Sequence, residues 1–105
     1  MQITRDVVLN ILYESIDELN EQRRLDSRLV RSPDTRLLGE QVGLDSLGFI
    51  NLIALIEERC QERFGKTLVL SDAASTAGTR DPFHTVGSLA EFVELYLSGR
   101  LASWQ

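Results

Sequence analysis

The chain has 105 residues, 43% of them hydrophobic and 26% charged, a composition typical of one globular domain and not of a disordered chain. Its 11 basic and 16 acidic residues give a net charge of −5, which argues against binding to nucleic acid or to an anionic membrane surface. It contains no apolar run long enough to span a bilayer and no signal-peptide pattern, and its single cysteine excludes an internal disulfide. We expect a cytoplasmic, monomeric domain with its core at about residues 4–98 and a tail at 99–105.

Residues 4–24 are predicted to form the first helix. Apolar residues recur there at intervals of three and four and share one face: Val8, Ile11, Leu12, Ile16 and Leu19. Thr4 is the expected N-cap, and Asp6 in the first turn suits the positive end of the helix dipole. This pattern predicts an amphipathic helix that packs through one side.

The segment 25–44 is predicted to be a long connection, because it is polar and contains a Ser-Pro-Asp sequence and two glycines. Connections of more than about 12–15 residues are uncommon in compact domains unless they are functional or anchored. Four leucines are expected to anchor it to the core: Leu29, Leu37, Leu38 and Leu44. Asp26 and Asp34 lie among the five arginines of residues 23–36, so we interpret these arginines as part of a solvated loop and not as an anion site.

The second helix is predicted to span residues 46–64, with Gly65 as a left-handed stop. Its apolar residues occupy a wide arc: Leu47, Phe49, Ile50, Leu52, Ile53, Leu55 and Ile56. One buried side of a helix does not require an arc of this width. Part of it is therefore expected to face a partner or a bound acyl chain.

The segment after the second helix is rich in small residues, and a single helical turn is expected near residues 72–75. The last helix is predicted to begin at a capping box formed by Ser88 and Glu91, with Val86 as the hydrophobic staple and Gly99 at its end. Its buried face is expected to contain Leu89, Phe92, Val93, Tyr96 and Leu97. Since no segment shows the period-two alternation of a strand, the predicted fold is all-α, with three longer helices and one short helix.

The sequence Gly43-Leu44-Asp45-Ser46-Leu47, followed by an apolar helix, resembles the prosthetic-group attachment site of acyl and peptidyl carrier proteins. The predicted helices also resemble the four-helix bundle of that family. The resemblance covers about residues 7–97 and is specific only around residues 43–47. It implies that a phosphopantetheinyl transferase moves 4'-phosphopantetheine from coenzyme A onto the hydroxyl of Ser46, and that the arm then holds an acyl or aminoacyl thioester.

The same resemblance implies partners and roles for the neighbouring residues. An adenylating ligase or an acyltransferase would load the arm, and a downstream enzyme would use the thioester, so the protein would be a carrier and not an enzyme. Asp45 would help to orient the transferase and its metal ion, and Leu47 would be an apolar contact for partner enzymes. Phe49, Ile50 and Asn51 are predicted to extend this docking surface.

The residues also permit simpler interpretations, which stay open here. Serine and aspartate are both preferred N-caps, so Asp45 and Ser46 would suit the start of any helix. Leu47 would also suit core packing, and Phe49 would suit burial against the first connection. The rival function is an unmodified helical domain that binds a partner protein through the apolar face of the second helix.

Two residues depart from the carriers of fatty acid synthesis. Gly48 and Asn51 stand where acidic residues are usual in those proteins, and the glutamates that follow are largely offset by Arg59 and Arg63. This helix is expected to dock poorly to enzymes that recognise an acidic stripe, because charge complementarity sets partner choice. The departure favours a dedicated carrier of an amino acid or a specialised acyl group, and Asp45-Ser46-Leu47-Gly48 also resembles stand-alone aminoacyl carriers.

Other chemistry receives little support from the residue pattern. Cys60 shares a helix face with Ile56 and Phe64, which predicts a buried and unreactive thiol. One cysteine and one histidine, His84, do not make a zinc site. No catalytic set is recognisable, so neither a metal nor an enzymatic activity is predicted.

Overall fold

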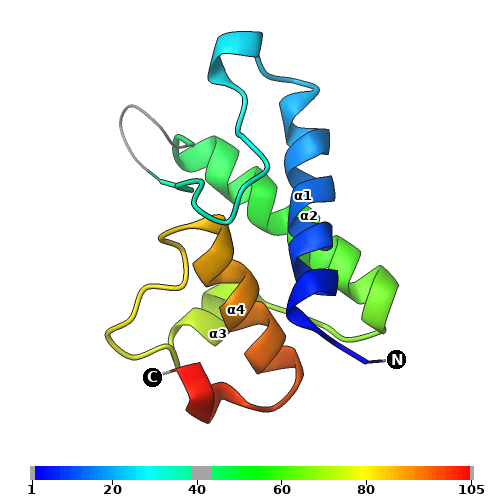
Figure 1. The fold of residues 1–105 in the computed structure, drawn as a ribbon, viewed down its shortest axis with the longest axis vertical. Coiled ribbons are helices and arrows are strands. Elements are labelled where there is room, and N and C mark those ends of the chain that lie inside the picture. Colours follow the sequence, from blue (N-terminus) through cyan, green and yellow to red (C-terminus); the bar gives the residue numbers. More distant parts are fainter. Residues whose placement is uncertain (1, 39–43, 105) are drawn as a thin grey trace.

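Helices make up the regular secondary structure of the computed structural model, which describes residues 2–38 and 44–104 (Figure 1). Its elements in chain order are α1 (Arg5–Asn20), the 3₁₀ turn η1 (Leu25–Ser27), α2 (Ser46–Phe64), α3 (Leu70–Ala74), α4 (Val86–Leu97) and the 3₁₀ turn η2 (Leu101–Trp104). Strand pairing within the described residues is limited to two isolated bridges, Arg36 with Thr85 and Leu38 with Leu44. The prediction of an all-α fold with three longer helices and one short helix is confirmed.

Helix α1 contacts both other long helices, α2 and α4 (Figure 1). Its predicted apolar face is buried, and the Thr4 hydroxyl caps it by accepting a 3.3 Å hydrogen bond from the N–H of Val7. The helix ends at Asn20 and not near residue 24. The Asn20 side-chain amide forms two 2.9 Å hydrogen bonds with the backbone of Leu29, which draws the chain away from the helix axis.

Helix α2 has the predicted bounds. It is followed by Gly65 with a φ of 66°, a left-handed conformation in which a side chain would be strained. Its buried residues recur every four positions and form a narrow stripe: Gly48, Leu52, Ile56 and Cys60. Most of the wide apolar arc therefore lies beside this stripe, half-buried or exposed.

The first connection is fastened to the N-terminal end of α4. The N–H of Val86 donates to the carbonyl of Thr35 at 2.9 Å, and the N–H of Gly87 donates to the carbonyl of Pro33 at 2.8 Å. The first turn of a helix has N–H groups with no partner inside the helix, and here the connection supplies two of the missing acceptors.

Three of the four anchoring leucines are buried as predicted: Leu29, Leu37 and Leu44. The prediction for Leu38 is wrong, because 46% of this residue is exposed. The chain bends at Leu37, between the isolated bridges formed by Arg36 and Leu38, and Leu37 is the residue that enters the core.

Helix α3 is the short helical turn predicted near residues 72–75, and it lies slightly earlier in the chain, at Leu70–Ala74. It begins at Leu70, whose N–H donates a 2.7 Å hydrogen bond to the carboxylate of Glu57 on α2. Leu70 and Ala73 are buried, so this short helix attaches the second connection to the core.

Helix α4 begins at Val86 with Thr85 as its N-cap. Thr85 and Ser88 form the capping box, with reciprocal side-chain to backbone hydrogen bonds of 2.9 and 3.1 Å. The predicted box from Ser88 to Glu91 with Val86 as a staple is wrong, because the helix starts before Ser88. Val86 is its first residue and is fully buried.

Part of the tail predicted at residues 99–105 folds back onto the core. Trp104 in η2 is buried, and its ring lies 5.2 Å from that of Phe92 in an edge-to-face arrangement. The indole N–H donates to the carbonyl of Ala77 at 3.1 Å. The C-terminal turn therefore holds the connection between α3 and α4 against α4.

Candidate functional site

Ser46 is the first residue of α2, and its side chain is exposed. The residue before it, Asp45, is the N-cap: its carboxylate Oδ1 accepts a 2.8 Å hydrogen bond from the N–H of Gly48. No hydrogen bond joins the Ser46 hydroxyl to any residue of the described part of the chain. Capping therefore belongs to Asp45, and the hydroxyl of Ser46 remains accessible to another molecule.

The position of Ser46 suits a phosphate group. The N–H groups at the start of a helix and the positive end of the helix dipole both favour negative charge. The first turn of α2 itself contains no acidic residue, and the adjacent carboxylate of Asp45 is engaged as the cap. A phosphodiester on Ser46 Oγ would lie in this field and would project away from the core.

Three of the four predicted docking residues face outward. Leu47 is 69% exposed and Ile50 is 62% exposed, although both are aliphatic, and Asn51 is also exposed. Exposed aliphatic side chains that lie close together are typical of binding sites, whereas single ones need no explanation. The first turns of α2 therefore present an apolar surface directly after Ser46.

Phe49 has a different position from the other predicted docking residues. It is half-buried, and its ring packs edge-to-face against Phe83 with centroids 5.2 Å apart. Phe83 belongs to the connection between α3 and α4. Phe49 therefore packs against that connection, whereas the alternative interpretation of the sequence placed it against the first connection. Phe49 therefore couples the first turn of α2 to the α3–α4 connection.

The residues before Asp45 divide into two groups. Gly43, the first residue of the motif, lies outside the described residues. Leu44 is buried, and its N–H donates a 2.9 Å hydrogen bond to the carbonyl of Leu37. Leu44 therefore anchors the chain just before the site, as predicted.

Arg23, three residues after the end of α1, lies beside the first turn of α2, a proximity that the sequence did not indicate. A β-carbon built on Gly48 would lie 3.4 Å from Arg23 Nη1 and 3.1 Å from Asp45 Oδ1. The Nε–H of Arg23 donates to the carbonyl of Ser27 at 2.7 Å, which orients the side chain. The guanidinium therefore lies against the first turn of α2, at a point left open because Gly48 has no side chain.

Cys60 is fully buried, as predicted. Burial, with a smaller contribution from Glu57, raises the pKa of the Cys60 thiol to about 11. A thiol that stays protonated is a poor nucleophile. His84 is exposed, and the described residues contain no group of three metal-ligating side chains. No helix in the described part of the chain is long and apolar enough to cross a membrane.

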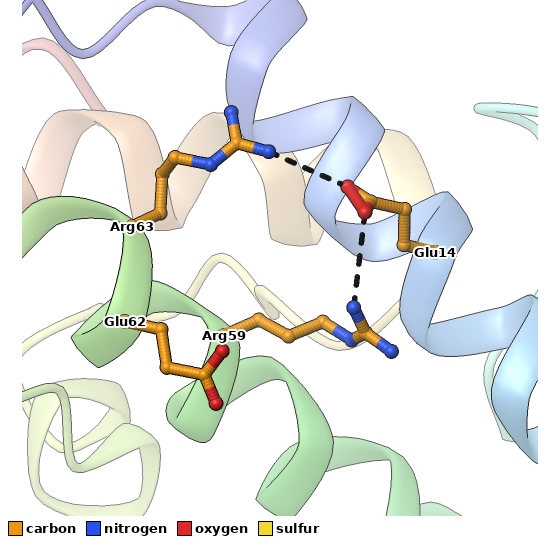
Figure 2. Close-up of a pocket in the computed structure, with 4 residues that line it drawn as sticks. All are labelled: Glu14, Arg59, Glu62 and Arg63. Carbon is orange, nitrogen blue, oxygen red and sulfur yellow. Dashed lines mark ion pairs between the residues drawn. The ribbon is translucent and has the colours of Figure 1, made fainter.

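A charged hollow lies between α1 and α2, away from Ser46. Figure 2 shows Glu14 of α1 facing Arg59 and Arg63 of α2, with an ion pair of 3.7 Å to each. Arg59 also pairs with Glu18. Since both arginines are already neutralised by glutamates, this cluster joins two helices and is poorly suited to bind an anion.

Comparison with known proteins finds no match to this chain among family models, curated proteins or solved structures. The functional argument therefore depends on the geometry around Ser46.

Proposed function

We propose that this protein is a carrier that holds an acyl or aminoacyl group as a thioester on a 4'-phosphopantetheine arm attached to Ser46. The observation that carries the proposal is that Asp45 caps α2 while Ser46 takes no part in capping. Asp45 alone caps α2, which leaves the Ser46 hydroxyl exposed at the positive end of a 19-residue helix. Such a hydroxyl suits a group that enters the active site of another protein.

In the proposed modification, the Ser46 oxygen attacks the phosphorus next to the pantetheine half of coenzyme A. The new Oγ–phosphorus bond forms, the phosphoanhydride bond breaks, and the adenosine half of coenzyme A leaves. The hydroxyl proton passes to a base of the transferase. This chain contributes an exposed nucleophile and a helix terminus that stabilises the phosphodiester product. The arm, when attached, supplies the thiol that carries the cargo.

The arrangement of the elements supports the same proposal. The order of helices, long, long, short and long, with a long first connection, resembles that of carrier proteins. Leu47 and Ile50 supply an apolar surface for the transferase and for the enzymes that load and unload the arm. The absence of acidic residues from the first turn favours a dedicated carrier of an amino acid or a specialised acyl group over a carrier of fatty acid synthesis.

Intact-protein mass spectrometry tests the proposal. Wild-type protein incubated with coenzyme A and a broad-specificity phosphopantetheinyl transferase should gain the mass of one arm, and Ser46→Ala should gain none. Ser71→Ala, at another exposed helical serine, is the matched control and should be modified like the wild type. A folded wild-type protein that gains no mass would contradict the proposal.

The second candidate function is an unmodified interaction domain, favoured by the exposure of Leu47 and Ile50. Because Asp45 is the cap, Ser46→Ala is expected to change the free energy of unfolding by no more than about 0.5 kcal/mol. Loss of partner function in a Ser46→Ala variant of unchanged stability therefore favours the carrier. Loss only in Leu47→Ser or Ile50→Ser favours the interaction domain.

A further inference from the structure

The charge of this chain is unevenly distributed along the sequence. Residues 23–36 contain five arginines and two aspartates, a net charge of +3. The rest of the chain carries −8, and the two parts together give the total of −5. The segment lies between α1 and α2, and its first residue, Arg23, lies against the helix that begins with Ser46. A protein that is acidic as a whole therefore places a cation beside its proposed attachment site.

Two hydrogen bonds and one close approach to α2 describe the position of Arg23. The Nε–H donates to the carbonyl of Ser27, the carbonyl of Arg23 accepts a 3.3 Å hydrogen bond from Arg28 Nε, and Nη1 lies within 3.4 Å of the point where a side chain at residue 48 would begin. Asp45 Oδ1 lies 3.1 Å from that same point. The guanidinium and the capping carboxylate thus flank one spot on the first turn of α2.

This arrangement changes the electrostatic character of the surface around Ser46. The first turn of α2 has no acidic residue, and the guanidinium of Arg23 approaches this turn at the same point as the capping carboxylate. The nearest glutamate on α2 is Glu57, three turns along the helix. An enzyme that approaches Ser46 therefore meets two exposed aliphatic side chains, Leu47 and Ile50, and Arg23 lies against the same turn of α2 at Gly48.

We infer that Arg23 is a specificity-determining residue for the enzymes that reach Ser46. The docking surface formed by Arg23, Leu47 and Ile50 fits a partner with an apolar pocket edged by carboxylates, and it disfavours an enzyme whose docking face is basic. The inference rests on the proposed function, because it concerns the enzymes that modify and load Ser46. Charges at the edge of an interface act mainly on association rate and partner choice, and their effect decreases with salt.

The test uses two purified phosphopantetheinyl transferases with coenzyme A: one with a basic docking face and one of broad specificity. Attachment of the arm is followed by intact mass, and kcat and KM are determined separately. The variants are Arg23→Glu, Arg23→Gln and Arg23→Lys. Arg63→Glu is the matched control, because it makes the same charge change at the opposite end of α2.

Arg23→Glu should lower KM for the basic-faced transferase about tenfold, with kcat within about twofold of the wild type. Arg23→Gln should give an intermediate KM, and Arg23→Lys should behave like the wild type. Arg63→Glu should leave KM unchanged, and the differences should disappear at about 1 M salt, where charges are screened beyond about 3 Å. Helical circular dichroism establishes that each variant is folded.

Two outcomes overturn the inference while leaving the proposed function intact. In the first, the wild type gains the arm but KM does not depend on the charge at residue 23. In the second, Arg63→Glu lowers KM as much as Arg23→Glu, which would show that net charge and not position matters. If neither enzyme attaches the arm to any folded variant, the proposed function itself fails, and the inference fails with it.

Discussion

The N–H of Gly87 donates a 2.8 Å hydrogen bond to the carbonyl oxygen of Pro33, and a β-carbon at residue 87 would lie 3.0 Å from that oxygen. The backbone of the first connection thus lies directly on the first turn of α4. Because the obstructing atoms belong to the backbone and the rigid ring of Pro33, they have little freedom to move away. Glycine at this position allows the long connection before Ser46 to be attached to the rest of the fold.

Gly87→Ala should therefore lower the free energy of unfolding by about 1–2 kcal/mol, although alanine is the better helix former. Urea denaturation measures the change. Gly48→Ala is the matched comparison, because its β-carbon would meet only side chains, those of Asp45, Leu44 and Arg23, which are able to shift. It should cost less than Gly87→Ala, and an equal cost at the two sites would contradict this account.

Two substitutions at Asp45 separate capping from partner recognition. Asp45→Ala removes the acceptor for the N–H of Gly48 and should lower stability by about 1 kcal/mol. Asp45→Asn keeps an oxygen acceptor at the same place and should lower stability less. If Asp45 also orients the transferase and its metal ion, both variants should be modified slowly on Ser46. Normal modification of Asp45→Asn would limit the role of this residue to capping.

Cys60 should make stability depend on alkaline pH. Its pKa is about 11 in the folded protein and 9.0 for the unperturbed thiol, so the unfolded state releases its proton first as pH rises. The contribution of the protonated thiol is complete below about pH 9 and decreases between pH 9 and 11. Chemical denaturation at several pH values in this range should show that the free energy of unfolding decreases less steeply with pH in Cys60→Ala than in the wild type. Equal slopes for the variant and the wild type would show that the thiol titrates normally.

Arg80 should hold the C-terminal turn in place. Its guanidinium lies 3.7 Å from the centroid of the Trp104 ring, donates to the Trp104 carbonyl at 2.7 Å, and pairs with Glu91. Arg80→Ala should therefore cost about 1 kcal/mol and shift the emission of this single tryptophan to longer wavelength. Arg80→Lys keeps the charge but not the planar fork, and it should restore only part of the effect. An unchanged emission spectrum in Arg80→Ala would argue against this role.

The pair between Arg80 and Glu91 also predicts an effect of acid. Hydrogen bonding from Arg80 lowers the pKa of the Glu91 carboxyl. The pair's contribution to the free energy of unfolding is therefore complete above the ordinary glutamate pKa of about 4.3. It is lost as pH falls through the lower pKa that Glu91 has in the folded protein. The Trp104 emission should move to longer wavelength in that range before the helices unfold. Emission that changes only together with helical circular dichroism would contradict the prediction.

The features that local sequence predicts correctly depend on neighbours three or four residues apart. The buried face of α1, the Thr4 cap, the bounds of α2 and the left-handed Gly65 are of this kind. Helical periodicity and capping act within one or two turns, so residue types and spacing contain the information needed. The motif around Ser46 is likewise a local pattern, and its position at a helix start was predictable.

The features that were missed depend on contacts between distant segments. Thr85 and Ser88 offer a capping box much as Ser88 and Glu91 do, and α4 starts at Val86 because this residue is buried and the first connection supplies acceptors to its first turn. Trp104 is buried because Phe92, Ala77 and Arg80 meet there from separate elements.

Arg23 shows the same contrast between local sequence and distant contacts at the candidate site. Its sequence neighbours indicate only a solvated, arginine-rich loop. It lies beside Gly48 because α1 ends at Asn20 and the chain turns across the start of α2. Local sequence thus establishes which residue is the proposed attachment point and why it begins a helix. The charge that surrounds it arises only when segments 25 residues apart pack together, a contact that helical periodicity and capping patterns do not encode.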